Sequence, residues 1–469
     1  MQASVKVSYV GAGSAVFARQ LVTDILAIDG LQRGEFALVD IDEGRLDMAR
    51  RLTERLVERA GKHWKVTAST DRNAVLRGSD FVINSIEVAG RASIGIDYEI
   101  PLRYGVDQCI GDTIGPGGIF KALRTGPAWL EIAEDVVRLC PGAVVLNYTN
   151  PMSILTLAAT RATGLRVIGL CHSVQGTSRR LARYLDVPYE QLTWRCAGIN
   201  HNAWFTELHC DREDLYPRLR QLAQRPEVYE QDPVRFEVML RLGAFVTESS
   251  GHFSEYVPYF RKRPELVERY CRPGYLGESG FYPRNWPIWQ EEHQRLARAW
   301  AAGDEPMPSG RSQEYASTIV EAMALGRPAV VHGNVVNEHL IENLPAGGCV
   351  EVPCLVEPSG VQPLHFGHLP EQLAALNRAH MAVHELTVEA LLTGDRQAAI
   401  HALMLDPLTA AACSLEQIEQ LFEEMWAAER RSLAGFIERS HPSRRPPAAA
   451  APAQRAGGET QRSALLPRL

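Results

Sequence analysis

Three side chains in the sequence could bind a metal ion or transfer a proton. Cys171 and His172 directly follow the apolar run 165–170, and His201 lies in the next strand-like segment, 197–204. A cysteine thiolate and a histidine imidazole are both good ligands for divalent metal ions. Either residue alone is more often structural, because buried cysteines and histidines are ordinary components of a protein core. Together, Cys171 and His201 could coordinate the same metal ion.

The elements that must position these residues follow a βαβ pattern. The apolar run 165–170 predicts a buried strand, so Cys171 and His172 should lie at its carboxyl end, where open α/β sheets bind their ligands. Earlier strands are expected at residues 5–10, 36–40, 65–68, 79–87 and 143–146, with helical segments between them. We therefore expect an α/β fold whose first part, residues 1–195, is a Rossmann-type NAD-binding domain.

A glycine turn joins the first expected strand to a helix. Gly11, Gly13 and Ser14 stand between the run 5–10 and an amphipathic segment. Glycines let the backbone approach a pyrophosphate, whose charge is favoured by the free N–H groups at the start of a helix. Val16 stands where the full fingerprint has a third glycine. The turn predicts dinucleotide binding through Gly11, Gly13 and Ser14.

Asp40 ends the second expected strand. A carboxylate there can accept hydrogen bonds from the adenosine ribose, which favours NAD over NADP. The alternative is that Asp40 only caps the helix that starts near Glu43. We also expect Asn84, in the strand 79–87, to contact the NAD cofactor.

The later part of the sequence contains further polar segments. Residues 111–120 are rich in glycine and suit either a lid or a close-packed wall beside a ligand. The strand 143–146 runs into Asn150-Pro151, as in lactate and malate dehydrogenases, where such an asparagine faces the nicotinamide and the substrate. Residues 247–259 carry many polar and aromatic groups.

Long helical segments dominate the rest of the chain, with short strands expected at 329–337 and 348–354. The helices are expected at residues 232–245, 313–325, 369–392, 396–403 and 415–432. These patterns predict a second, mixed α+β domain over residues 196–441, for the substrate, the metal ion and oligomer contacts. Residues 442–469 are rich in Pro, Ala, Arg and Gly and are expected to be disordered.

Composition excludes several classes of function. The chain has 469 residues, 45% hydrophobic and 22% charged, with a net charge of −7, which describes an enzyme of ordinary size. It has no basic cluster for nucleic acid and no apolar run near the ~20 residues that cross a bilayer. Nine cysteines without a CxxC pair, and a strand that begins at once, lead us to expect a cytoplasmic protein with reduced thiols.

The sequence resembles glycoside hydrolase family 4 over roughly residues 4–424. The matching motifs occur in the right order, at 11–14, Asp40, 150–151, 171–175, 198–201 and 250–256. Segments 111–124 and 334–353 are similar to the melibiase, α-galacturonidase and α-glucosidase branch. The resemblance implies a homodimeric or homotetrameric α-glycosidase that needs NAD and a divalent metal ion, typically Mn²⁺.

The resemblance also implies a reaction. NAD⁺ oxidises the sugar at C3, the glycosidic oxygen is eliminated, water adds, and the hydride returns. The substrates would be small unphosphorylated α-galactosides, α-galacturonides or α-glucosides. The family's motifs make Cys171 and His201 the metal ligands, and Asn150 and Arg311 substrate-binding residues.

Two proton-transfer roles remain to be assigned. The phospho-glucosidase branch has an acid after the ligand cysteine, whereas this chain has His172, which we take as the acid for the leaving group, or else as a simple hydrogen-bond partner. Tyr256 is our candidate base, with His252 as the alternative base or a substrate contact. A rival prediction is an NAD-dependent 2-hydroxy acid or sugar dehydrogenase, and a second rival is an NAD-sensing protein without catalysis.

Overall fold

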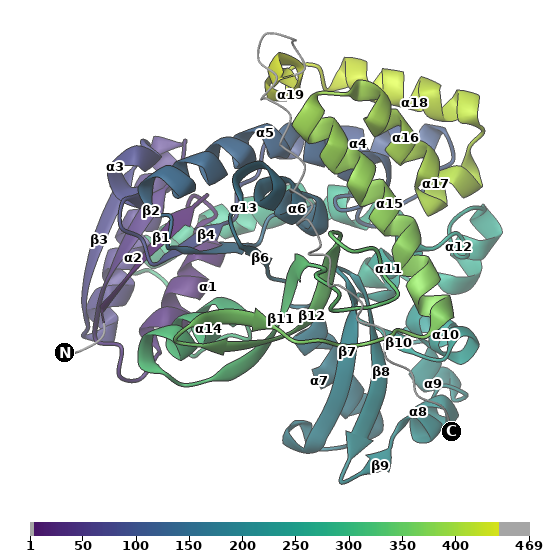
Figure 1. Ribbon diagram of the computed structural model, residues 1–469, viewed down its shortest axis with the longest axis horizontal. Coiled ribbons are helices and arrows are strands. Elements are labelled where there is room, and N and C mark those ends of the chain that lie inside the picture. Colours follow the sequence, from purple (N-terminus) through teal and green to yellow (C-terminus); the bar gives the residue numbers. More distant parts are fainter. Residues whose placement is uncertain (1–3, 440–469) are drawn as a thin grey trace, which may run out of the picture.

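The computed structural model describes residues 4–439, and one mixed sheet runs through them (Figure 1). Its 13 described strands include the path β10-β8-β7-β12-β11-β6-β5-β4-β1-β2-β3, with β13 and β9 beside β12 and β8. The predicted tail, residues 442–469, lies outside the described residues.

The first part of the chain forms the parallel half of this sheet. Strand order β3-β2-β1-β4-β5-β6, with all five pairings parallel, is that of a Rossmann fold, as predicted. The elements are β1 (Ser4–Val10), α1 (Ala15–Leu26), β2 (Arg33–Val39), α2 (Glu43–Ala60), β3 (His63–Ser69), α3 (Arg72–Leu76), β4 (Phe81–Asn84), α4 (Arg91–Arg103), α5 (Gly115–Leu139), β5 (Val144–Asn147), α6 (Met152–Thr163), β6 (Val167–Gly169) and α7 (Ser173–Leu185).

The second part extends the same sheet with antiparallel strands. These are β7 (Leu192–Ile199), β8 (Asn202–Cys210), β9 (Glu213–Asp214), β10 (Phe245–Val246), β11 (Ala329–Val336), β12 (Cys349–Glu357) and β13 (Gly360–Pro363). Figure 1 shows β11 and β12 between the Rossmann strands and β7, although they come later in the chain than β7. Strand β7 spans the boundary expected at residue 195, and the division into two domains stays a prediction.

The helices of the second part cover this extension. They are α8 (Tyr216–Leu222), α9 (Pro226–Tyr229), α10 (Pro233–Leu242), α11 (Ser250–Tyr256), α12 (Pro264–Tyr270), α13 (Phe281–Ala302), α14 (Tyr315–Leu325), α15 (Glu371–Thr393), α16 (Arg396–Leu405), α17 (Pro407–Ala412), α18 (Leu415–Ala428) and α19 (Ala434–Arg439), with short 3-10 turns at Tyr189–Gln191 and Gly274–Leu276. In residues 4–439 no helix has both the length and the apolar character needed to cross a membrane.

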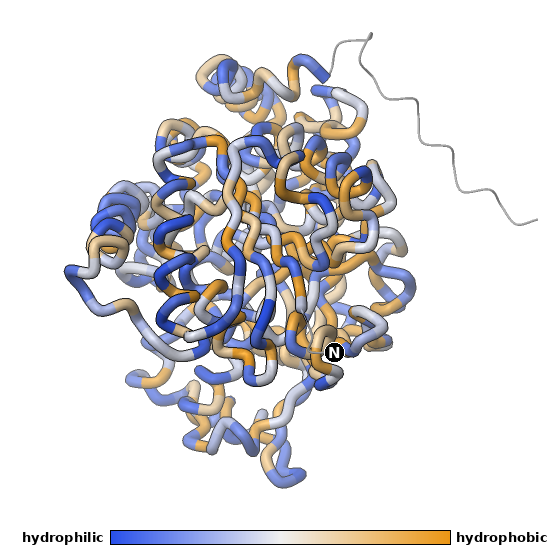
Figure 2. Tube along the Cα trace, turned by 90° about the vertical axis from the view of Figure 1, so that its left-hand side faces the viewer, coloured by the Kyte–Doolittle hydropathy of each residue, from blue (hydrophilic) through white to orange (hydrophobic). Residues whose placement is uncertain are grey.

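Hydrophobic strand residues form the centre of the molecule. Val7, Leu38, Ile83 and Leu146, from four neighbouring strands, are at most 1% exposed. Figure 2 shows hydrophobic segments gathered in the interior and hydrophilic segments around the outside. Burial of this apolar surface is the main favourable contribution to folding, and it holds the strand ends in fixed positions.

The glycine-rich segment 111–120 is a packed wall rather than a lid. Gly115 is the first residue of α5, and the following residues 116–120, which belong to that helix, are all buried. A Cβ atom at Gly117 would lie 2.2 Å from the carbonyl oxygen of Gly111, and one at Gly118 would lie 2.4 Å from the backbone of Thr113. The glycines are therefore needed for close approach of backbone to backbone, and the expectation of a flexible loop is wrong.

Candidate active site

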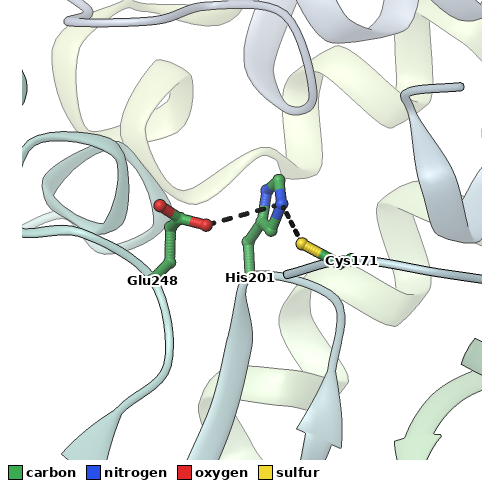
Figure 3. A group of neighbouring side chains, drawn as sticks. All are labelled: Cys171, His201 and Glu248. Atoms are coloured by element: carbon green, nitrogen blue, oxygen red, sulfur yellow. Dashed lines mark hydrogen bonds and ion pairs between the residues drawn. The ribbon is translucent and has the colours of Figure 1, made fainter. Parts of the chain in front are cut away.

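The side chains of Cys171, His201 and Glu248 converge on one point (Figure 3). Cys171 lies between β6 and α7, His201 in the turn between β7 and β8, and Glu248 just after β10. The Sγ atom of Cys171 is 3.3 Å from Nε2 of His201, and Nε2 is 3.5 Å from a carboxylate oxygen of Glu248. One ligand atom from each residue lies within 4.8 Å of the others.

This donor set fits a divalent ion. Thiolate and imidazole donors suit ions such as Zn²⁺, and a carboxylate oxygen suits harder ions such as Mn²⁺. Burial raises the pKa of the Cys171 thiol to about 11, so a nearby cation is needed to hold its thiolate. Burial raises the pKa of Glu248, but the charge of His201 and other neighbouring groups outweighs burial and lowers it overall. The cluster therefore offers a carboxylate, and a thiol that a bound cation would convert to the thiolate.

Helix α11 places two further candidate residues around His201. The hydroxyl of Tyr256 shares a hydrogen bond of 3.3 Å with Nδ1 of His201, on the opposite side of the ring from Cys171. The ring of His252 lies 4.8 Å from the ring of His201, and its Nε2 has no hydrogen-bond partner among the described residues. Burial and the neighbouring His201 lower the pKa of His252 to about 4, so this imidazole is neutral. Burial, with Glu248 and Asp112, raises the pKa of Tyr256.

The side chain of His172 is exposed and lies next to Cys171. Its Nδ1 lies 3.6 Å from a carboxylate oxygen of Glu314, the residue that precedes α14. The charges of Cys171 and then Glu314 raise the pKa of His172, which favours the protonated imidazole. Glu314 was not singled out from the sequence, because nothing in the segment 310–314 indicates which of its polar residues faces the site.

The two predicted substrate-binding residues lie differently. Asn150 is half-buried where β5 leads into α6, and its peptide bond to Pro151 is cis. Arg311 instead directs its guanidinium to α14, where it hydrogen-bonds to Ser317 and pairs with Glu321 at 2.5 Å. The structure thus places Arg311 against a helix rather than against the cluster of Cys171.

The glycine turn lies at the other end of the same sheet edge. Gly11 has φ +87°, and a Cβ atom there would lie 2.6 Å from the carbonyl oxygen of Ser85, so only glycine fits. The N–H of Gly13 donates to Oδ2 of Asp40 at 2.7 Å. Ser14 precedes α1, and its side chain does not cap that helix.

Asp40 is not the cap of the next helix, which corrects the alternative expectation. The cap of α2 is Asp42, whose side chain accepts a hydrogen bond of 2.9 Å from the N–H of Arg45. Asp40 accepts from Asp42 and Gly13 instead. It therefore belongs to the glycine turn.

Asn84 lies at the carboxyl end of β4, the strand that pairs with β1 beside the glycine turn. Its Nδ2 donates to Oδ1 of Asn147 at 2.8 Å and to Thr149 at 3.1 Å. Its own Oδ1 has no hydrogen-bond partner among the described residues. That oxygen is itself buried, since Asn84 is 0% exposed.

A buried lysine also lies near the site. Lys121 of α5 is 5% exposed, and its Nζ lies 3.0 Å from Glu87 and 3.3 Å from Asp112. Lys121 was not a candidate from the sequence, and Glu248 was noted only as part of the polar segment 247–259, because its partners lie far away in the chain.

Comparison with known protein families identifies the chain. Residues 6–187 match the family 4 glycosyl hydrolase model, and residues 196–409 match the model of the family 4 C-terminal domain. The chain belongs to glycosyl hydrolase family 4. This confirms the resemblance seen in the sequence, and it favours a glycosidase over a dehydrogenase or an NAD sensor.

Two characterised relatives of this family 4 enzyme are α-galactosidases. The α-galactosidase of Bacillus subtilis (strain 168) is 42% identical over 427 residues, covering 90% of this chain and 98% of the relative. The α-galactosidase of Rhizobium meliloti (strain 1021) is 36% identical, covering 92% and 90%. The match extends over nearly the full length of both.

Solved structures support the fold. A 6-phospho-α-glucosidase from gut microorganisms, in complex with NAD and Mn²⁺, superposes with a TM-score of 0.78 at 20% identity, over 92% of this chain and 99% of that one. A lactate dehydrogenase from Cryptosporidium parvum superposes with a TM-score of 0.51 at 16% identity, over 82% and 98%. The predicted lactate dehydrogenase-like Rossmann fold is confirmed.

Proposed function

We propose that this enzyme hydrolyses unphosphorylated α-galactosides with the help of NAD⁺ and a divalent ion, Mn²⁺ or a similar metal. The observation that carries the proposal is the convergence of Cys171, His201 and Glu248 on the same sheet edge as the glycine turn of a Rossmann fold. The α-galactosidase relatives support the choice of sugar. The solved homologue that holds NAD and Mn²⁺ supports the choice of cofactors.

The residues of the turn would hold NAD. Gly11, Gly13 and Ser14 present backbone to a pyrophosphate at the start of α1, and Asp40 would accept from the adenosine ribose. Asn84, at the carboxyl end of β4, would contact the nicotinamide half. When bound, NAD supplies a hydride acceptor for C3 of the sugar and returns the hydride at the end of the cycle.

Cys171 and His201, with Glu248 beside them, would hold the divalent ion. Such an ion supplies Lewis acidity to the sugar oxygens at C2 and C3. Use of Nε2 as the ligand atom leaves the proton of His201 on Nδ1, where it donates to the oxygen of Tyr256. This hydrogen bond and the charge of a bound ion would both favour the phenolate form of Tyr256, and we propose that this phenolate removes the proton at C2.

His172 would donate a proton to the leaving oxygen. Its ring is exposed toward a ligand, and Glu314 stabilises the imidazolium from the far side. His252, neutral and with an unpartnered Nε2, would hydrogen-bond to a sugar hydroxyl. We keep Asn150 and Arg311 as proposed substrate-binding residues, although Arg311 would have to leave Glu321 to reach a sugar.

The charges around the site favour a neutral sugar. Glu248 and Glu314 are carboxylates near the cluster, and the charge of the buried Lys121 is already compensated by Glu87 and Asp112. A carboxylate or a phosphate at C6 would meet these like charges. We therefore propose a galactoside in preference to a galacturonide or a phosphorylated glycoside.

The deciding experiment follows NADH during turnover. With nitrophenyl α-galactoside, NAD⁺ and Mn²⁺ under reducing conditions, nitrophenol should accumulate while NADH absorbance stays at the level of the enzyme sites. Release of one NADH per turnover would instead mean a dehydrogenase. The same assay with the α-galacturonide and α-glucoside tests the choice of sugar, and a larger kcat/KM on either would replace the α-galactoside.

We also propose a cytoplasmic homodimer or homotetramer. All nine cysteines are free in the structure, and they would remain reduced in the cytoplasm. Light scattering of the purified full-length chain tests the oligomeric state, and a monomer would reject that part of the proposal.

A further inference from the structure

Glu351 is a buried carboxylate without hydrogen-bond partners. It lies on β12 and is 0% exposed, and neither of its carboxylate oxygens has a partner among the described residues. The other buried acids have donors: Glu255 accepts from the N–H groups of Cys109 and Ile110, and Glu429 pairs with Arg124. A buried carboxylate without a donor or a counter-charge is strongly unfavourable, so Glu351 requires an explanation.

Glu351 is one of a series of residues in register with one another on neighbouring strands of the sheet. It stands in register with Gly198 of β7 on one side and with Asn334 of β11 on the other, and Asn334 is in register with Gly169 of β6. The amide of Asn334 donates to the carbonyl of Gly169 at 3.3 Å. Asn334 also lowers the pKa of Glu351, but burial outweighs this effect and raises that pKa to about 7.

The two glycines of this series begin the segments that carry the proposed metal ligands. Cys171 follows Gly169 by two residues, and His201 follows Gly198 by three. Glu351 therefore stands between the two chain segments that meet at the ion position. Its charge acts on Cys171 and on His201.

Within residues 4–439, no lysine or arginine is among the groups that act most strongly on Glu351. The charged groups that act most strongly on Glu351 are His201 and Glu248, both of them members of the cluster. A second carboxylate beside Glu248 and the Cys171 thiolate would be repelled in the absence of an ion. A divalent cation among Cys171, His201 and Glu248 would reverse that repulsion.

We infer that Glu351 is a positioning residue for the divalent ion, which it stabilises by its charge without coordinating it. This inference rests on the metal site proposed above, and it adds a fourth residue that none of the ligand motifs contains. Carboxylates behind the ligands commonly strengthen metal binding in this way.

The test is titration of Mn²⁺ alone into the metal-free full-length enzyme, with binding measured by isothermal titration calorimetry. Glu351→Gln keeps the shape and removes the charge, and it should weaken Mn²⁺ binding by about 10- to 100-fold. Glu351→Asp, which keeps the charge, should lose less. The metal-free Glu351→Gln protein should melt at the same temperature as the parent or higher, because an uncompensated buried charge has been removed.

Glu429→Gln is the matched control. It removes another buried carboxylate, one that pairs with Arg124 at 3.4 Å away from the cluster. It should lower the melting temperature and leave Mn²⁺ affinity unchanged.

Two results would overturn the inference. Unchanged Mn²⁺ affinity in Glu351→Gln would mean that the carboxylate does not act on the ion. A fall in melting temperature, or failure of that variant to fold, would mean that Glu351 stabilises the protein by itself. If the parent enzyme binds no Mn²⁺ at all, it is the proposed metal site that fails, and the two failures are thereby distinguished.

Discussion

Nδ1 of His172, which precedes α7, lies 3.6 Å from a carboxylate oxygen of Glu314, which precedes α14. Glu314 is itself held in place through Ser312, whose N–H donates to Asp24 of α1 at 2.7 Å. The proposed acid is thus supported by the helix that follows the glycine turn.

Replacement of His172 by Ala should slow substrates with poor leaving groups by about 10²- to 10⁴-fold and nitrophenyl galactoside far less, because nitrophenolate leaves without a proton. Glu314→Gln should show the same selectivity with smaller losses. The measurement is kcat on both substrate types, with bound Mn²⁺ determined for each variant. Equal losses on the two substrates would remove the acid role from His172.

Replacement of Cys171 by Ser should weaken Mn²⁺ binding while NAD affinity stays near the parent value, since a neutral hydroxyl replaces a thiolate. Metal analysis after dialysis measures the first quantity and fluorescence titration the second. Cys140→Ser is the control, because Cys140 is a buried cysteine in the Rossmann core away from the cluster. Full metal occupancy in Cys171→Ser would exclude Cys171 as a ligand.

Replacement of Asp40 by Arg should shift cofactor preference from NAD toward NADP, because it removes the ribose acceptor and adds a partner for the 2′-phosphate. Asp42→Ala should lower helix stability by about 1 kcal/mol and leave cofactor preference unchanged, since Asp42 is only the cap. Dissociation constants for both nucleotides are compared. If Asp40→Arg binds both as the parent does, the ribose contact is disproved.

Replacement of Tyr256 by Phe separates two roles of one hydroxyl. If the hydroxyl is the base, metal cannot replace it, so turnover and exchange of the C2 hydrogen with solvent should stay low even at saturating Mn²⁺. A hydroxyl that only orients His201 would instead be compensated by more metal. Full recovery of activity at high Mn²⁺ would therefore reject Tyr256 as the base.

Acid should destabilise the protein through its buried histidines. Burial lowers the pKa of His332 to about 4 and that of His384 to about 3, from an ordinary 6.5. The unfolded chain therefore binds more protons in this range, and stability falls as the pH drops from about 6.5 toward 4, by up to about 1.4 kcal/mol per pH unit for each group. His384→Gln should flatten the dependence in denaturant titrations, whereas replacement of the exposed His293 should not. An unchanged slope in His384→Gln would contradict this assignment.

The Rossmann half could be predicted from the sequence because its signals are local. In this half, a strand ends at Val10, a turn follows at Gly11 and a helix begins directly after it. The spacing of apolar residues that is typical of each element can be read from the sequence. The approach of Cys171 to His201 was foreseen as a hypothesis, since both follow apolar runs.

Other features depend on contacts that no local pattern encodes. Helix α13 was not expected from the sequence, and it contains an internal Pro287, which is unusual within a helix. Glu248 and Glu314 belong to irregular segments, so only the folded chain reveals what they face. For residues 111–120 the sequence left a lid and a close-packed wall open, and the structure shows close packing, because glycine permits close approach as well as flexibility.

The insertion of β11 and β12 between β6 and β7 has a consequence for the order of assembly during synthesis. Ribosomes deliver residues 1–200 long before residues 329–357, so the segments of Cys171 and His201 emerge without the two strands that lie between them in the sheet. Domains of growing chains fold from the N-terminus, and contacts of long sequence separation close last. The nucleotide-binding half can therefore form on the ribosome, whereas the metal centre matures only after the chain has passed β12, and metal loading belongs to the finished protein.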